Sequence, residues 1–272
     1  MIKDITIGQF FPGESPIHRM DPRMKLILTV AYIVMLFIAN NAASLLVGVI
    51  FLLIVYPVSG ISGKMVLRSV KPILPIIAIT AVLNMFFIDG EVLFQLWKIR
   101  ITDKGVITAV MMCARIVCLI AGTSLMTYTT SPIALTDAIE RLFSPLKKIK
   151  LPVHEVAMMM TIALRFIPTL IEETDKIMSA QKARGADIES GNLVQRIRAL
   201  VPILIPLFVS AFRRAEELAL AMECRCYHGG EGRTRMRQLH LGKLDVVAAC
   251  VTAVCLAAAI LANVHIQVFV LR

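Results

Sequence analysis

The sequence has 272 residues, of which 57% are hydrophobic, and its mean hydropathy is +0.77. Soluble domains contain roughly 45–50% apolar residues, so this composition indicates a membrane protein and excludes an ordinary soluble domain. Charged residues make up 18% of the chain, which is more than hydrocarbon-spanning helices accommodate. A large part of the chain is therefore expected in water or at the membrane surface, and a bundle of membrane spans alone is excluded as well.

The formal net charge is +10. Such an excess is typical of cytoplasmic loops and of contact with anionic headgroups, so membrane lipid is an expected partner. Because no basic motif is interleaved with aromatic residues, nucleic acid is not expected. The six cysteines mostly lie in apolar runs without a Cys-x-x-Cys pair, which indicates neither a disulfide framework nor a zinc finger.

Apolar runs near the roughly 20 residues that a membrane span requires occur at five places. These runs lie at about 25–40, 42–59, 72–88, 106–128 and 245–270. Only the uncharged dipeptide Asn40-Asn41 separates the first two, which predicts a tight helical hairpin. Between the third and fourth runs, apolar and basic residues alternate from Trp97 to Ile101, which indicates a short outer hairpin.

The chain opens with a polar stretch, so no cleavable signal peptide is expected.

Basic residues are distributed unevenly between the loops, and this distribution predicts the orientation of the spans. They are concentrated before the first span and between the second and third, whereas the loop 89–104 balances three basic residues against three acidic ones. The N-terminus is therefore expected in the cytoplasm and the C-terminus outside. The basic residues of the two inner segments are Lys3, Arg19, Arg23, Lys25, Lys64, Arg68 and Lys71.

This pattern predicts an all-α integral membrane protein with three regions. Residues 1–128 would hold four transmembrane helices, and residues 244–272 would hold the fifth. Between them, residues 129–243 would form a cytoplasmic region with three amphipathic helices.

Apolar stripes at helical spacing mark these three helices. The first is expected at about 132–146. The second is expected at about 152–184, with a bend at Pro168, because proline lacks the backbone donor of a helix interior. The third carries an apolar stripe over 208–222, opposite a charged face.

The second and third helices end in a similar way. Arg184 precedes Gly185 at the end of one, and Arg225 lies between Cys224 and Cys226 at the end of the other. An arginine in a last turn complements the helix dipole and Gly185 is an ordinary C-terminal cap, so capping accounts for each end taken alone. The recurrence of the pattern instead favours docking onto a partner with paired sites.

Five strings of the sequence resemble the transmembrane coupling subunits of energy-coupling factor (ECF) transporters, the EcfT or CbiQ-type family. These strings are residues 20–26, 129–132, 164–168, 180–185 and 221–227. Each is short, but their order around five spans is specific, and the similarity covers nearly the whole chain. The resemblance implies a subunit of an ABC importer of vitamins or transition-metal ions in a prokaryotic cell membrane.

In that family, two short arginine motifs end the coupling helices and bind two ATPase subunits, which hold the ATP. A separate membrane subunit, the S-component, binds the substrate, so the resemblance implies a non-catalytic chain without a cofactor or a substrate pocket of its own. The second motif usually reads Ala-Arg-Gly, and cysteine in its last position adopts a left-handed cap less readily than glycine, which leaves the ending of that helix open. The residues to which the resemblance assigns ATPase binding are Ala183, Arg184, Gly185, Cys224, Arg225 and Cys226.

Six further residues are expected to have structural or coupling roles. Arg115 lies near the middle of the fourth span, where a charge costs roughly 2.5–3.5 kcal/mol on insertion scales, so it should face protein or water. It would form a buried structural pair or a contact with the S-component that changes during transport. A break near Pro202 to Pro206 is expected, because one unbroken helix over 192–225 would carry its tip roughly 50 Å. The six residues are Asp21, Pro22, Arg23, Arg115, Pro168 and Pro206.

The sequence contains partial matches to two other kinds of functional site, an ATP-binding loop and a metal site. An ATP-binding loop needs Gly-x-x-x-x-Gly-Lys followed by Ser or Thr. The nearest string, residues 60–65, has the wrong spacing and lacks the hydroxyl, so the chain itself is not expected to be an ATPase. Cys224, Cys226 and His228 lie within five residues and have side chains that ligate metal ions, although a fourth ligand is not evident. The alternative function is therefore a membrane metal-binding protein or metalloenzyme centred on these three residues.

Overall fold

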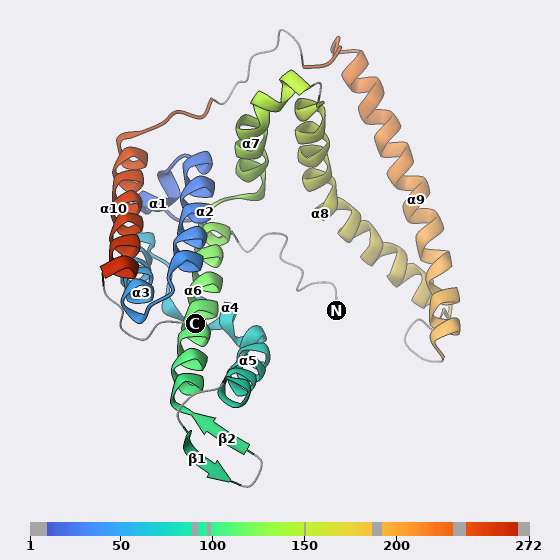
Figure 1. The fold of residues 1–272 in the computed structure, drawn as a ribbon. Coiled ribbons are helices and arrows are strands. Elements are labelled where there is room, and N and C mark those ends of the chain that lie inside the picture. Colours follow the sequence, from blue (N-terminus) through green and yellow to red (C-terminus); the bar gives the residue numbers. More distant parts are fainter. Residues whose placement is uncertain are drawn as a thin grey trace. The chain divides into compact units, whose positions relative to one another are not determined.

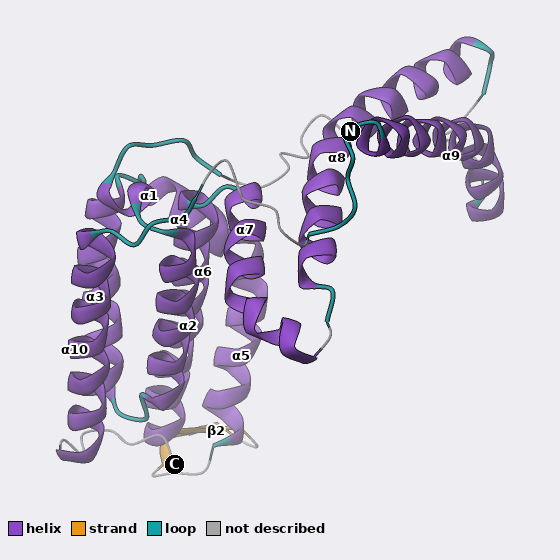
Figure 2. Ribbon diagram, turned by 90° about the horizontal axis from the view of Figure 1, so that it is seen from above, coloured by secondary structure: helices purple, strands orange, loops and turns teal. Residues whose placement is uncertain are grey.

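A computed structural model describes residues 10–88, 92–96, 99–149, 151–186, 192–230 and 238–265. The described residues form two compact units. We call 10–138 together with 238–265 the bundle unit, and the described part of 139–230 the paired-helix unit. Figure 1 and Figure 2 show the elements of both.

The bundle unit consists of helices and one small hairpin. Its elements are α1 (Pro16–Arg19), α2 (Pro22–Ile38), α3 (Ala42–Ser59), α4 (Gly63–Val70), the 3-10 helix η1 (Lys71–Ile73), α5 (Leu74–Phe87), β1 (Val92–Leu96), β2 (Ile99–Thr102), α6 (Asp103–Thr129) and α10 (Lys243–His265). The long helices α2, α3, α6 and α10 pack side by side (Figure 2).

The paired-helix unit is dominated by two long helices. α7 (Pro132–Phe143) leads from the bundle unit into it, and the 3-10 helix η2 (Ser144–Ile149) follows. The two long helices are α8 (Val153–Ala183) and α9 (Leu193–Glu223). The first amphipathic helix predicted from sequence is thus α7, which ends before residue 146 and continues as η2.

Five segments of the described chain are long and apolar enough to cross a membrane: Ala42–Ser59, Gly63–Phe87, Asp103–Thr129, Val153–Ala183 and Lys243–His265. Together with the helical content, they confirm the all-α membrane fold. All except Val153–Ala183 coincide with spans predicted from sequence. The end of the last predicted span, after residue 265, lies outside the described residues.

α2 takes the place of the first predicted span, but it has only 17 residues, which is the lower limit for crossing a bilayer. It stops at Ile38 because Ala39 has an extended backbone, and Asn41 then caps α3, so the predicted hairpin at Asn40-Asn41 is confirmed. α8 satisfies the length and composition of a span, although the sequence analysis predicts it as cytoplasmic. Most of its charged residues follow Pro168, so only its first half suits hydrocarbon.

The core of the bundle unit lies where α2, α3, α6 and α10 meet. Tyr32, Leu36 and Leu52 belong to this buried cluster. Two glycines allow the helices to approach closely: a Cβ atom at Gly48 would come within 2.7 Å of Leu36 Cδ2, and one at Gly122 within 2.5 Å of Tyr32 Cε1. Small residues at helix contacts are typical of packing in membranes, where no hydrophobic force drives the helices together.

β1 and β2 pair as an antiparallel hairpin (Figure 1). This confirms the short hairpin predicted between the third and fourth apolar runs, although its turn at 97–98 lies outside the described residues. Thr102 then caps α6, because its hydroxyl oxygen accepts a hydrogen bond from the Gly105 N–H at 3.1 Å.

Both long helices of the paired-helix unit are continuous. α9 contains Pro202 and Pro206 without interruption, so the predicted break at these residues is wrong. Pro206 has no N–H for the carbonyl of Pro202, four positions earlier. The side-chain amide of Gln181, on α8, donates to that carbonyl at 3.4 Å instead. The neighbouring helix thus supplies a donor that the proline cannot. α8 is likewise continuous through Pro168, and it changes direction along its length (Figure 1), as predicted.

Candidate functional site: two helix ends with exposed arginines

The end of α8 is closed by its own backbone. The N–H of Gly185 donates to the Lys182 carbonyl at 3.0 Å, and the N–H of Ala186 donates to the Gln181 carbonyl at 3.0 Å. This pair of bonds is the Schellman motif, which requires a left-handed residue. Gly185 supplies it with φ +84°, immediately after Arg184.

The end of α9 is closed by the same pair of backbone hydrogen bonds. The N–H of Cys226 donates to the Glu223 carbonyl at 2.8 Å, and the N–H of Tyr227 donates to the Met222 carbonyl at 3.1 Å. Cys226 has φ +55° and is the one residue other than glycine with positive φ in the described chain. Cysteine therefore occupies the left-handed position after Arg225 despite its Cβ atom, and the two helices end alike.

Both arginine side chains extend into solvent. Arg184 and Arg225 are exposed, and the structure describes no hydrogen bond or ion pair between either guanidinium and the described residues. Since backbone bonds complete both caps, neither guanidinium is needed to close its helix. The five N–H donors of each guanidinium group are available to a partner.

α8 and α9 pack as an antiparallel pair, joined by polar contacts. Late α8 meets early α9 at Gln181 and Pro202, whereas Glu173 meets residues further along α9. The Glu173 carboxylate accepts from the Ser210 hydroxyl and forms an ion pair with Arg214, with 2.9 Å between Oε2 and Nη2. In an antiparallel pair, the two C-terminal ends point in opposite directions.

The Asp21-Pro22-Arg23 segment lies in the bundle unit and holds helix ends together. Asp21 is the N-cap of α2, with its carboxylate accepting from the backbone N–H of Arg23 at 2.9 Å. The guanidinium of Arg23 contacts both Asp21 carboxylate oxygens, the closest at 2.6 Å, and donates to the Leu239 carbonyl at 3.2 Å. Pro22 is the first residue of α2, where its missing N–H costs nothing.

Asp245 extends this cluster to the start of α10. Its carboxylate accepts from the backbone N–H of Asp21 at 2.9 Å and from that of Gly242 at 2.7 Å. Asp21 and Asp245 are 4% and 3% exposed. The hydrogen bonds to Asp21 raise the pKa of the Arg23 guanidinium above its ordinary value, so the cation stays charged beside the two carboxylates. The segment thus joins the start of α2 to Leu239 and to the start of α10.

Arg115 faces protein, as its position in α6 predicts. Its guanidinium donates to the carbonyl of Ala39, just after the end of α2, and the Asn263 side chain donates to the nearby Ile38 carbonyl at 3.2 Å. Carbonyls at a helix C-terminus lack intrahelical donors and carry partial negative charge. Arg115 thus stabilises the end of α2 by a charge-to-carbonyl contact.

Cys224, Cys226 and His228 are all exposed at the end of α9. In the part of the chain that the structure describes, no three His, Cys, Asp or Glu side chains are grouped so that they would hold a metal ion. The geometry therefore gives no support to the alternative of a metal site at these residues.

Comparison with known proteins identifies the family. A sequence profile of the CbiQ family, described as cobalt transport protein, matches residues 13–236. The chain belongs to this family. Its relatives include the protein of Clostridium kluyveri, 54% identical over 267 residues that cover 97% of this chain and 98% of the relative. The protein of Thermosediminibacter oceani is 53% identical over 251 residues, covering 92% and 95%. That of Lactococcus lactis subsp. cremoris is 47% identical over 239 residues, covering 88% and 90%.

All three relatives are named energy-coupling factor transporter transmembrane protein EcfT. The resemblance drawn from the five sequence strings is confirmed. This EcfT family member is thus a multi-pass transmembrane component of an ECF transporter.

Several residues that organise the site have no role in the sequence analysis. Arg214 lies there only within the charged face of the third amphipathic helix, Asp245 only at the start of the last span, and Glu173 is not singled out. For Asp245 a signal exists, because an aspartate at the start of an apolar run is typical of a helix N-terminus. For Glu173 and Arg214 no local signal exists, since each is one charged residue among several on its face.

Proposed function

We propose that this chain is the coupling subunit of an ECF importer, linking ATP hydrolysis by two ABC-type ATPase subunits to uptake through a substrate-binding S-component. Ala183, Arg184 and Gly185 would bind one ATPase, and Cys224, Arg225 and Cys226 the other. The single observation that carries the proposal is the repeated geometry: two helix ends closed by the same pair of backbone hydrogen bonds, each with an exposed arginine immediately before a left-handed residue.

The spacing of the two arginines supports paired docking. Arg184 lies 11 residues after Glu173, and Arg225 lies 11 residues after Arg214, so both are equally far from the ion pair that joins the helices. At 1.5 Å per residue, each tip is roughly 16 Å from the pair along its own helix. Because the helices are antiparallel, equivalent groups are presented in opposite directions, as two subunits related by two-fold symmetry require.

The proposed mechanism is mechanical and involves no chemistry on this chain. Each guanidinium would place its planar donor fork against carboxylate or carbonyl oxygens of an ATPase groove. When the two ATPases close on ATP, the docked tips move, and the Glu173–Arg214 ion pair makes α8 and α9 move together. The substrate, a vitamin or metal ion, would be bound by the S-component, and ATP by the ATPases.

The orientation belongs to the same proposal. The basic residues before α2 and in α4 favour a cytoplasmic N-terminus, and the C-terminus would lie outside. Both arginine-tipped ends would then lie in the cytoplasm, with the ATPases. Labelling single cysteines from either side of the membrane tests this: outside labelling of a cysteine that replaces Lys64 contradicts it.

Uptake assays test the function. The Arg184→Ala/Arg225→Ala variant should lose ATP-driven uptake at matched membrane expression, while substrate binding to the S-component is retained. The Arg184→Lys/Arg225→Lys variant should also be impaired, because lysine lacks the planar fork. If the arginines only stabilise their helices by interacting with the helix dipole, the lysine variant should transport normally, because lysine carries the same charge. Full transport by the double alanine variant would remove both residues from the mechanism.

A further inference from the structure

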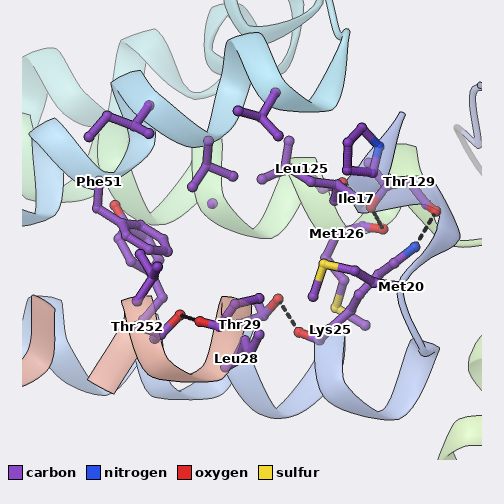
Figure 3. Close-up of a pocket in the computed structure, with 18 of the residues that line it drawn as sticks. Ile17, Met20, Lys25, Leu28, Thr29, Phe51, Leu125, Met126, Thr129 and Thr252 are labelled. Atoms are coloured by element: carbon purple, nitrogen blue, oxygen red, sulfur yellow. Dashed lines mark hydrogen bonds between the residues drawn. The ribbon is translucent and has the colours of Figure 1, made fainter. Parts of the chain in front are cut away.

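An apolar cavity adjoins the packed core of the bundle unit (Figure 3), and the core residues Tyr32 and Leu52 line it. In α10, Ala259 belongs to the buried core, whereas Ala248, about three turns earlier, lines the cavity together with Val247. The cavity has a volume of about 340 Å³. It lies where α2 and α10 begin and where α3 and α6 end, and Ile17 of α1 lines it as well.

The hydroxyl groups in the cavity wall are already bonded to backbone carbonyls. Thr29 donates to Lys25, Thr129 to Leu125, and Thr252 to Ala248, at 2.7, 2.9 and 2.8 Å. A hydroxyl has one proton to donate, and each of these protons is used within its own helix. These three hydroxyls therefore have no proton left to donate to a polar solute.

Lys25 is the exception at one end of the cavity. It is only 6% exposed, and its ammonium donates to the carbonyl of Thr129 at 2.8 Å (Figure 3) and to that of His18 at 3.2 Å. An ammonium has three N–H donors, and the structure describes no ion pair for Lys25 with the described residues. One donor of a buried cation is thus left for an acceptor at this end.

The cavity opens between α3 and α10. Its lining residues Ile54 and Val247 are each 60% exposed, whereas Leu52 and Thr252 are 7% and 4% exposed. The mouth is therefore as apolar as the floor. In a membrane, acyl chains surround such a mouth, and an unfilled apolar space would forfeit the dispersion contacts of its wall.

We propose that this cavity binds one phospholipid of the surrounding leaflet. One acyl chain would lie between α3 and α10 against Leu52 and Thr252, and a phosphate oxygen of the headgroup would accept the remaining Lys25 N–H. The site requires a long apolar chain with a single acceptor at its end, and it offers no second polar anchor. This combination selects a membrane lipid over a polar metabolite.

Lipid retention by the purified transporter complex tests the site. We would wash the complex with mild detergent and measure bound phospholipid per chain by mass spectrometry. Ala248→Trp fills the cavity from α10, and Val254→Trp is the matched control, because Val254 is on the same helix, 67% exposed and absent from the cavity wall. The wild type and the control should retain the phospholipid, and Ala248→Trp should lose it.

A second measurement covers the case in which Ala248→Trp does not assemble. Val55→Phe fills the same cavity from α3. Adding back 1-palmitoyl-2-oleoyl-phosphatidylglycerol should raise the Tm of the stripped wild-type complex, because a bound ligand stabilises the folded state, but should not raise the Tm of Val55→Phe. Equal lipid retention by filled and control variants, or no retention by the wild type, would overturn the proposal.

Discussion

Glu173 of α8 and Arg214 of α9 form the ion pair, with 2.9 Å between Oε2 and Nη2, that lies midway between the two exposed arginines. Glu173 also accepts from Ser210, so one carboxylate holds two positions of α9. Because the pair is partly shielded from water, its contribution should exceed that of an exposed pair. We infer that it fixes the register of α8 against α9 and hence the placement of the two tips.

A double-mutant cycle measures this contribution. Glu173→Ala and Arg214→Ala should each destabilise the complex and lower ATP-driven uptake, and their coupling energy should be about 1 kcal/mol. The pair Arg213–Glu217 is the internal control: it is 4.0 Å apart, with side chains 81% and 70% exposed, and its coupling should be at most about 0.5 kcal/mol. Equal coupling for both pairs would contradict a special role for Glu173.

Because Cys226 has a left-handed backbone conformation, replacing it with glycine should increase the stability of the end of α9. Cys226→Gly should stabilise the end of α9 by about 1 kcal/mol, because glycine adopts φ +55° without the steric cost of a Cβ atom. Gly185→Ala should destabilise the end of α8 by a similar amount. Hydrogen exchange at residues 184–186 and 225–227 reports on each end separately.

Cys224→Gly is the control for this prediction. Cys224 has φ −59° and a right-handed helical backbone, so glycine there should destabilise the helix by roughly 0.3 kcal/mol, the difference between the two helix propensities. If Cys226→Gly and Cys224→Gly changed hydrogen exchange in the same direction, the left-handed cap at Cys226 would be refuted.

Substitution of Asp245, which lies in the bundle unit, should lower the stability of the protein strongly. Asp245→Ala removes the acceptor of two backbone donors, those of Asp21 and Gly242, and should cost about 1–3 kcal/mol. Asp103→Ala removes an exposed acidic residue from the first turn of α6 and should cost roughly 0.5 kcal/mol through the helix dipole. Thermal denaturation of the two variants in detergent compares them. Equal Tm values would show that Asp245 does not join α2 to α10.

The membrane spans were predictable because each is a local apolar run. The hairpin at Asn40-Asn41 and the bend of α8 follow from residues within a few positions of one another, and the structure agrees with both. The family resemblance rests on short strings, such as Ala180 to Gly185, that are also local. Patterns among neighbouring residues are therefore sufficient to predict most of the helices and their order along the chain.

The contacts that position the site were not predictable because they join distant residues. The bond between Asp21 and Asp245 spans 224 positions, and that between Gln181 and Pro202 joins two helices. The second bond compensates for Pro206 within the continuous helix α9: proline removes a donor from its own helix, and the sequence does not show that Gln181 of the neighbouring helix supplies another. Likewise, the intrinsic preference of cysteine disfavours the conformation that Cys226 adopts within its cap.

The amount of ATPase bound to the chain tests the central claim most directly. We would reconstitute wild type, Arg184→Ala, Arg225→Ala and the double variant with purified ATPase subunits, and measure affinity and stoichiometry. Each charge-assisted contact contributes about 1.5–3 kcal/mol, so each single variant should bind roughly tenfold to a hundredfold more weakly. The double variant should bind neither ATPase, because both docking ends are lost. Two ATPase subunits bound to the double variant with wild-type affinity would contradict the account.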